Sequence, residues 1–183
     1  MSNMAGRALL TYDDLSDFPD DGLRRELIAG ELIVSPSPNR RHQELVGSLY
    51  LFIANHVVAH GGGKVYLAPF DVLFSRHDVV EPDLLFIPDD RLDILTDANV
   101  QGVPGLVIEV LSNPRVDRLR KRDLYARSGV PEYWIVDPDA DRVEVYRLEA
   151  GGYGKPVVLE PDEILTYARL PGLSIDLEAL FAE

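Results

Sequence analysis

Two acidic residues interrupt apolar stretches of the chain, and they are the first candidates for chemistry. Glu109 is the only polar side chain in the run 106–111, and Asp83 opens the run 84–87. A buried carboxylate without a partner is so unfavourable that it takes up a proton, pairs with a cation or binds a metal ion. Both acids therefore require a partner.

Each acid also has an ordinary interpretation. Glu109 could sit at the rim of a sheet and pair with an arginine, and Pro82-Asp83 is a common turn dipeptide. The pair is more informative than either member, because carboxylates on neighbouring strands can jointly hold a hard cation, which prefers oxygen ligands. The separation of 109 − 83 = 26 residues permits such neighbouring strands.

A charged helix predicted from about residue 115 to 128 supplies further candidates. Asp117, Lys121 and Tyr125 recur at intervals of four residues and so share one helix face. They could form an ordinary surface ion pair with a nearby tyrosine. Alternatively, Lys121 lies over a metal site, where it orients or activates water and offsets the charge of a phosphate in the transition state. The spacing leaves both interpretations open.

The elements that position these residues follow from hydrophobic periodicity and turn signals. The pattern predicts a short helix after Thr11, a hairpin over 25–34, a helix over 41–60, strands at 64–74, 80–87 and 106–111, the helix 115–128, strands at 132–136, 142–148 and 157–159, and a terminal helix at 176–181. Prolines break the segment 35–39 after the hairpin. This order predicts an α/β or α+β fold with a mixed sheet and helices packed against it.

Composition limits the class of protein. The 183 residues fit a single domain, 1–183 with a core of about 12–181, and 46% of them are hydrophobic. The absence of cysteine excludes disulfides, thiolate catalysis and cysteine-ligated zinc. No apolar run approaches the roughly 18 residues of a membrane span, and Met1–Arg7 leads into no secretion core. We therefore expect a cytoplasmic protein without a membrane partner.

The charge of the chain bears on a nucleic-acid substrate. A net charge of −13 opposes binding to a polyanion, because Lys and Arg contacts to phosphates supply most non-specific affinity. The segment 115–127 nevertheless holds six Lys or Arg residues against two Asp, a local balance of 6 − 2 = +4. Arg40 and Arg41 form a smaller basic cluster with His42. These local clusters are compatible with a DNA substrate despite the negative net charge.

Several segments together carry a resemblance to a known family. In chain order they are Glu31-Leu32-Ile33, Arg41-His42, Glu81-Pro82-Asp83-Leu84, residues 106–112, Asp117 with Lys121 and Tyr125, residues 129–137 (GVPEYWIVD) and Leu170-Pro171-Gly172-Leu173. As an ordered set they resemble the Uma-type putative restriction endonuclease family, a branch of the PD-(D/E)XK nuclease superfamily. The likeness runs from about Tyr12 to Phe181.

The resemblance implies a restriction endonuclease-like core: a central mixed β-sheet flanked by helices, with an N-terminal β-hairpin. It implies Asp83 and Glu109 as the metal-binding acids, with the backbone carbonyl of Val110 also facing the metal. Superfamily members usually carry a lysine two positions after the second acid, where this chain has Leu111. In the Uma-type family a lysine of the following helix takes that role, which points to Lys121.

Four further residues are supporting candidates. Nucleases of this class often use an upstream acid to complete metal or water coordination, which would suit Glu31; it could equally be a solvent-facing strand residue. His42 could approach a phosphate or simply contact polar neighbours. Asp117 and Tyr125 share the helix face of Lys121.

The leading hypothesis is hydrolysis of DNA phosphodiester bonds with Mg²⁺ or Mn²⁺ at Asp83 and Glu109. A double-strand cut needs two sites, which predicts a homodimer. The alternative is a catalytically inactive nuclease-fold module used for binding or assembly, which Leu111 and the negative charge favour. A third possibility is a hydrolase acting on RNA or a nucleotide.

Overall fold

The computed structural model describes residues 8–35 and 37–182, and expectations for Met1–Arg7 and Pro36 lie outside these residues. Near the N-terminus, the 3-10 helix η1 (Tyr12–Asp17) is capped by Thr11, whose backbone N–H donates to Asp14 (2.7 Å). A four-stranded sheet of order β2-β1-β5-β4 follows. Its strands are β1 (Arg24–Ile28), β2 (Glu31–Ser35), β4 (Val72–Ser75) and β5 (Asp78–Val80).

The central sheet has seven strands and mixed pairing. Its order is β10-β9-β8-β7-β6-β3, with β11 pairing to β9; β7 and β8 are parallel and the other pairs are antiparallel. The strands are β3 (Gly63–Leu67), β6 (Leu84–Pro88), β7 (Leu106–Val110), β8 (Glu132–Asp137), β9 (Arg142–Glu149), β10 (Gly152–Tyr153) and β11 (Val157–Leu159). The remaining elements are η2 (Asp89–Ile94), β12 (Ile164–Leu165) and β13 (Ile175–Asp176).

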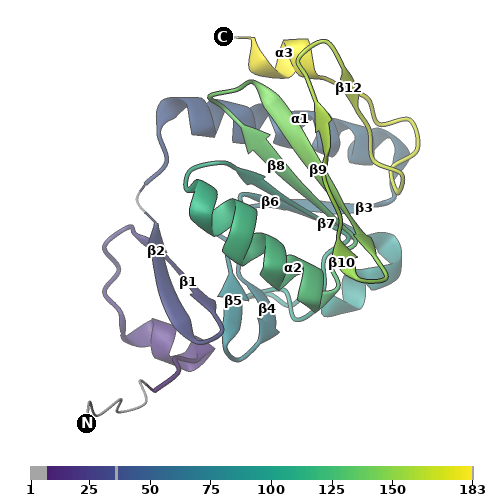
Figure 1. Cartoon of the computed structure of the whole chain (residues 1–183). Helices are drawn as coiled ribbons and strands as arrows, with labels where there is room; N and C mark the ends of the chain where they lie inside the picture. Colours follow the sequence, from purple (N-terminus) through teal and green to yellow (C-terminus); the bar gives the residue numbers. More distant parts are fainter. Residues whose placement is uncertain (1–7, 36, 183) are drawn as a thin grey trace.

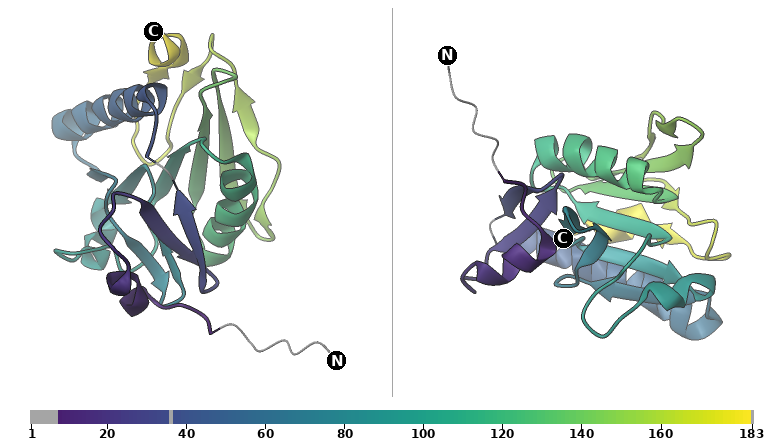
Figure 2. Two further views of the ribbon diagram at one scale, coloured as in Figure 1. Left: turned by 90° about the vertical axis from the view of Figure 1, so that its left-hand side faces the viewer. Right: turned by 90° about the horizontal axis from the view of Figure 1, so that it is seen from below.

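Helices cover both faces of this sheet (Figure 1). Helix α1 (Arg40–His60) lies against one face, and the π-helical turn η3 (Val116–Lys121) with helix α2 (Arg122–Ser128) lies against the other, as the view from below shows (Figure 2). Helix α3 (Leu177–Phe181) packs beside α1. The expected central mixed sheet flanked by helices, with an N-terminal hairpin, is confirmed.

Successive side chains of the central strands β6 and β7 point to opposite faces of the sheet, where they contribute to two separate hydrophobic cores. Leu84 and Phe86 of β6 pack on the α1 side with Leu49, whereas Leu85 and Ile87 pack on the α2 side. Odd-numbered residues of β6 and β7 therefore face η3 and α2. Glu109 shares this parity, which directs it towards the lysine-bearing helix, whereas Asp83 immediately precedes β6 and contacts His42 of α1 and Arg24 of β1.

Three predicted elements are wrong in their boundaries. The strand expected over 64–74 is split into β3 and β4, which belong to different sheets, and Pro69 between them lacks a backbone donor for a continuous ladder. The strand expected over 80–87 is likewise interrupted around Pro82. The helix expected from 115 begins with the π-helical turn η3 before α2. None of the helices in the described part of the chain is long and apolar enough to cross a membrane.

Candidate active site

Asp83 and Glu109 lie side by side at one end of the central sheet. The antiparallel register of β6 and β7 pairs Leu84 with Ile108, so Asp83, one residue before Leu84, is brought alongside Glu109, one residue after Ile108. The N–H of Val110 donates to Asp83 Oδ2 (2.8 Å), which ties one acid to the residue after the other. Each acid is only 2% exposed. The neighbouring strands expected from sequence are therefore present.

Lys121 approaches Glu109 from the helix layer. Its Nζ lies 2.9 Å from Glu109 Oε1, and the Tyr125 hydroxyl donates to the same oxygen (2.7 Å). The π-helical turn that ends at Lys121 is a geometry found often at functional sites. Asp117 lies at the start of this turn, buried, where it accepts the N–H groups of Ser112 (3.2 Å) and Asn113 (3.1 Å).

Glu26 joins the cluster although sequence reasoning did not single it out. Its Oε1 lies 2.9 Å from Lys121 Nζ and accepts the N–H of Glu81 (2.8 Å). Its Oε2 is buried and has no hydrogen-bond partner within the described residues. Strand β1 reads RRELI, so Glu26 stands among other charged residues and gave no signal of an acid isolated in an apolar run. Because Leu27 beside it is also fully buried, alternation alone does not separate an inner from an outer face.

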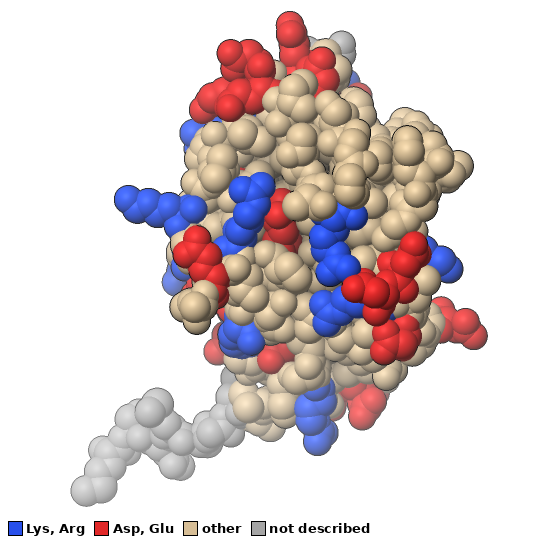
Figure 3. All heavy atoms as spheres, turned by 90° about the vertical axis from the view of Figure 1, so that its right-hand side faces the viewer, with Lys and Arg blue, Asp and Glu red and all other residues tan. Residues whose placement is uncertain are grey.

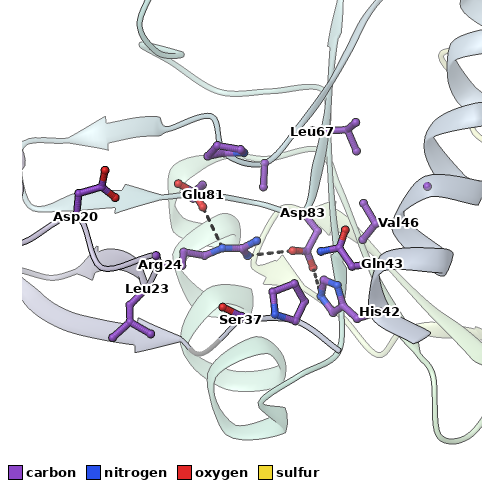
Figure 4. Close-up of a pocket in the computed structure, with 15 residues that line it drawn as sticks. Asp20, Leu23, Arg24, Ser37, His42, Gln43, Val46, Leu67, Glu81 and Asp83 are labelled. Carbon is purple, nitrogen blue, oxygen red and sulfur yellow. Dashed lines mark hydrogen bonds and ion pairs between the residues drawn. The ribbon is translucent and has the colours of Figure 1, made fainter. Parts of the chain in front are cut away.

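Asp83 is held by two further side chains (Figure 4). Arg24 Nη1 lies 2.9 Å from Asp83 Oδ1, and His42 Nε2 lies 3.0 Å from Asp83 Oδ2. Arg24 Nε also contacts Glu81 Oε1 (3.0 Å). His42 is positioned by the first turn of α1, where its N–H donates to the N-cap residue Asn39 (2.9 Å). Both Asp83 oxygens are thus engaged.

A cavity of about 510 Å³ opens beside Asp83, and a second of about 290 Å³ opens near Ser112. Arg24 and His42 line both, and Arg24 is the only Lys or Arg among the described residues that line either. Glu109 and Lys121 are buried and line neither cavity. Arg24 is therefore the guanidinium available to a molecule that enters beside Asp83.

The basic residues of the charged helix are largely neutralised by acids from elsewhere in the chain. Arg118 pairs with Asp137 and Glu144, and Arg120 pairs with Glu31. Arg127 likewise pairs with Asp78 of β5, whereas Arg122 pairs with Asp123, its neighbour on the same helix. On the face shown in Figure 3, Lys and Arg side chains are interspersed with Asp and Glu and form no continuous basic surface. The local excess of positive charge in the sequence does not become a basic surface there.

Glu31 does not join the cluster. Its side chain is 67% exposed and lies 2.8 Å from Arg120. The structure thus brings together Asp83, Glu109 and Lys121, with His42, Asp117 and Tyr125 around them. The upstream acid at the centre of the group is Glu26 of the first hairpin strand, and Glu31 of the second strand stays at the surface.

Burial and neighbouring charges shift these acids in opposite directions. Burial raises the pKa of Glu109 to about 8, against the lowering effect of Lys121. Burial would also raise the pKa of Asp83, but the hydrogen bond from His42 and the charge of Arg24 hold it below its ordinary value. Burial alone would lower the pKa of Lys121, and the adjacent carboxylates of Glu109 and Glu26 raise it. Asp83 and Lys121 are thus held charged, whereas Glu109 can exchange a proton near neutral pH.

The donor set suits a hard divalent cation. Glu26, Glu81, Asp83, Glu109 and Asp117 carry −5 when ionised against +2 from Lys121 and Arg24, which leaves −5 + 2 = −3. The buried Oε2 of Glu26 is an oxygen ligand without a partner in the described chain. No three acids or histidines of the described residues stand close enough to form a ready metal cluster. An ion at Asp83 would therefore have to displace Arg24 or His42 from its oxygens.

The raised pKa of Glu109 predicts that stability falls with rising pH in the metal-free protein. The group titrates near 4.5 when unperturbed and at about 8 when folded. Between these values the folded state keeps a proton that the unfolded state has lost, so the free energy of unfolding declines by at most about 1.4 kcal/mol per pH unit. Urea unfolding in this range should give a shallower decline for Glu109→Gln. An equal decline in both proteins would contradict the raised pKa.

Comparisons with known proteins point to one family. A family model described as "Uma2: Putative restriction endonuclease" matches residues 11–178. The fold resembles the crystal structure of a putative nuclease belonging to DUF820 from Anabaena variabilis, with a TM-score of 0.78 and 22% sequence identity, over 94% of this chain and 97% of that one. No curated protein matches the chain.

Proposed function

Because this chain belongs to the Uma2 putative restriction endonuclease family, we propose that it hydrolyses phosphodiester bonds in DNA with a divalent metal ion at Asp83 and Glu109. The observation that carries the proposal is the convergence of these two acids and Lys121 at one end of the central sheet. Glu26, whose Oε2 lacks a partner among the described residues, is a further candidate oxygen ligand, and the family resemblance adds the carbonyl of Val110. Mg²⁺ or Mn²⁺ bound there would polarise the phosphate and acidify a water molecule.

The roles of the protein side chains follow from their contacts. An ammonium group has three N–H donors, and Glu26 and Glu109 take two of those of Lys121. The remaining donor can bind the attacking water or a phosphate oxygen, where fixed positive charge favours the transition state. Tyr125 fixes Glu109 through its hydroxyl, and His42 fixes Asp83 through Nε2. These contacts orient the acids before substrate arrives.

Arg24 is assigned to the phosphate. Its guanidinium neutralises Asp83 and lies at both cavities, so a cation bound at Asp83 would release it towards an incoming phosphate. Guanidinium groups bind phosphate through two parallel N–H donors. This exchange would also uncover Asp83 Oδ1. Arg24 thus links metal binding to substrate binding.

Replacing Arg24 by glutamine separates these two effects. We expect Arg24→Gln to bind Mn²⁺ more tightly, because the competing cation is removed, and to bind DNA about tenfold or more weakly in Ca²⁺, because a charged hydrogen bond is lost. Calorimetry and fluorescence anisotropy measure the two affinities. Arg25→Gln is the matched control, since Arg25 pairs with Asp21 outside the cluster. Equal behaviour of the two variants would contradict the assignment.

A cleavage assay tests the proposed function. Purified protein is incubated with plasmid DNA, single-stranded DNA and RNA in Mg²⁺, in Mn²⁺ and in EDTA. We expect metal-dependent nicking or linearisation of the plasmid that EDTA abolishes. Cleavage of RNA alone would move the substrate to another nucleic acid, and cleavage in EDTA would contradict a metal-dependent reaction.

The second candidate function is an inactive nuclease-fold module for binding or assembly. It is favoured by the engagement of both Asp83 oxygens with Arg24 and His42, and by Leu111 at the position usually taken by lysine. Such a module would keep the ion pairs in place of a metal. Calorimetric titration with Mn²⁺ separates the two functions: a nuclease binds the ion and Glu109→Ala abolishes binding, whereas the inactive module gives no binding in either protein.

A further inference from the structure

The cavity of about 510 Å³ beside Asp83 has both charged and apolar walls. Eight of its described lining residues are apolar or glycine: Gly22, Leu23, Pro38, Val46, Gly47, Leu67, Ala68 and Pro69. Leu23 and Leu67 are among the exposed large apolar residues of the molecule, at 41% and 37% exposure. A cavity that joins such walls to a few charged groups is typical of a site for a small molecule or a single chemical group.

Gly47 leaves part of this cavity open. It lies in the interior of helix α1, where glycine is less favourable than alanine. A Cβ added at Gly47 would meet no described atom within 4 Å beyond its chain neighbours and its own helix backbone, so packing does not require a glycine there. Because Gly47 lines the cavity, a larger side chain would occupy space beside Asp83. The glycine therefore lowers helix stability and keeps the cavity open.

The charges of the lining determine which group fits. Arg24 is the only Lys or Arg among the described lining residues, whereas Asp20, Glu81 and Asp83 are acids. One phosphate can bind at Arg24, but these acids repel a second. The apolar walls instead suit a neutral group attached to that phosphate. A nucleobase is such a group, since enzymes hold extruded bases between aromatic or apolar side chains.

A paired duplex suits this site less well than a single unpaired nucleotide. Asp83 and Glu109 are each only 2% exposed, so a phosphate has to enter the molecule to reach them. The cavity volume lies within the roughly 300–1,000 Å³ of small-molecule sites and below the scale of a duplex segment. Arg118, Arg120 and Arg127 are paired with acids, which weakens the attraction available to the backbone of a duplex.

We infer that the cavity beside Asp83 holds the base of an unpaired DNA nucleotide whose phosphate lies at Arg24. Gln43, which lines the cavity from α1 with Val46, offers an amide donor and acceptor to the edge of that base (Figure 4). The inference rests on the proposed action on DNA and narrows its substrate to strands with an unpaired or extruded nucleotide. Supercoiled plasmid still qualifies, because negative supercoiling favours local strand separation.

The smaller cavity near Ser112 gives the strand a continuous path. The two cavities share four lining residues, Arg24, Ser37, Pro38 and His42. They therefore adjoin at the proposed phosphate position. The smaller cavity is also lined by Asn39, the N-cap of α1, and the N-terminus of a helix favours phosphate. The nucleotide adjacent to the extruded one can lie there.

Fluorescence anisotropy in Ca²⁺ tests the inference without requiring cleavage. Three DNA hairpins of equal stem length are compared: one fully paired, one with a single bulged nucleotide, and one in which the bulged nucleotide is abasic. We expect the bulged hairpin to bind at least about tenfold more tightly than the paired one. The abasic bulge should lose most of that gain, because it lacks the base that fills the cavity.

Gly47→Leu is the matched protein variant. Filling the cavity should reduce affinity for the bulged hairpin to about that for the paired hairpin, and should leave paired binding within about twofold. Gly47→Ala should weaken bulge binding less, while raising the melting temperature in circular dichroism, because alanine favours the helix. Ala59→Leu is the control, since Ala59 is exposed on the same helix outside the lining of this cavity.

The outcomes separate this inference from the proposed function. Equal affinities for paired and bulged hairpins, in a protein that cleaves plasmid DNA, would overturn the inference and leave the proposed function intact. A gain that the abasic bulge retains, or that Gly47→Leu leaves unchanged, would assign recognition to the bent backbone and overturn it equally. A protein that binds none of the hairpins and cleaves no nucleic acid would contradict both.

Discussion

Lys121→Met is expected to destabilise the protein by about 3–5 kcal/mol in the absence of metal. The ammonium lies 2.9 Å from the carboxylates of both Glu26 and Glu109, and all three side chains are buried. Methionine keeps the apolar stem but leaves two acids without a cation, and an uncompensated buried charge is far more unfavourable than a broken surface pair. Urea unfolding at a pH above the Glu109 pKa of about 8, where this acid is ionised in the wild-type protein, measures the loss.

Two further variants make this prediction specific. Arg120→Met removes the neighbouring helix cation, which pairs with exposed Glu31, and should change stability by less than about 1 kcal/mol. Adding Glu109→Gln to Lys121→Met should recover part of the loss, because one of the stranded charges is then removed. If Lys121→Met and Arg120→Met have equal effects, Lys121 is not the counter-ion of a buried acidic pair.

Glu109→Gln is expected to reduce the rate of plasmid cleavage by about a thousandfold. A metal ion contributes several kcal/mol of charge stabilisation to a phosphoryl transition state, and a loss of about 4 kcal/mol corresponds to that factor. Glutamine retains the size of the side chain and can still accept from Tyr125, so the fold should survive. Initial rates of nicking at saturating Mg²⁺ measure the effect.

Glu31→Gln provides the matched control for that experiment. Glu31 is an acid of the same hairpin as Glu26, but it lies at the surface against Arg120. Its replacement should leave the rate within about twofold, since exposed ion pairs contribute little. Comparable losses for Glu31→Gln and Glu109→Gln would mean that the upstream hairpin acid participates through a rearrangement, and would contradict the site as described.

The core of the candidate site could be anticipated because its residues violate a local pattern. Glu109 is an acid within an apolar strand and Asp83 immediately precedes one, and such exceptions are visible in the sequence without any knowledge of the fold. Lys121 required the family resemblance, since its spacing from Asp117 and Tyr125 also suits a surface helix. The family and the mixed sheet flanked by helices are both confirmed, whereas the catalytic roles remain predictions.

The features of the site that the sequence did not predict depend on contacts between segments far apart in the chain. Glu26 and Glu31 both lie in the N-terminal hairpin. Only the pairing of β1 with β5 makes β1 an interior strand of the four-stranded sheet and leaves β2 at the edge. The basic helix looked suited to phosphate in isolation, but Arg118 and Arg120 meet acids from β8, β9 and β2. No local propensity encodes these pairings. The role of Arg24 depends on the same tertiary context, because it reaches Asp83 across 59 positions of sequence.

The position two residues after Glu109, where superfamily members usually carry lysine, is occupied here by leucine. Leu111 packs with the apolar core on the α2 side, so no ammonium is supplied from the strand. Lys121 reaches Glu109 from the helix layer instead, through the π-helical turn. The cation is thus present at the second acid, although it comes from a different element.

Anomalous diffraction from a crystal soaked in Mn²⁺ tests the central claim most directly. The account predicts a strong peak within about 2.0–2.6 Å of carboxylate oxygens of both Asp83 and Glu109, with Arg24 moved away from Asp83. The same soak of Glu109→Gln should lose the peak. A fully soaked wild-type crystal with no peak at these acids, and with Arg24 and Lys121 still bound to them, would contradict it.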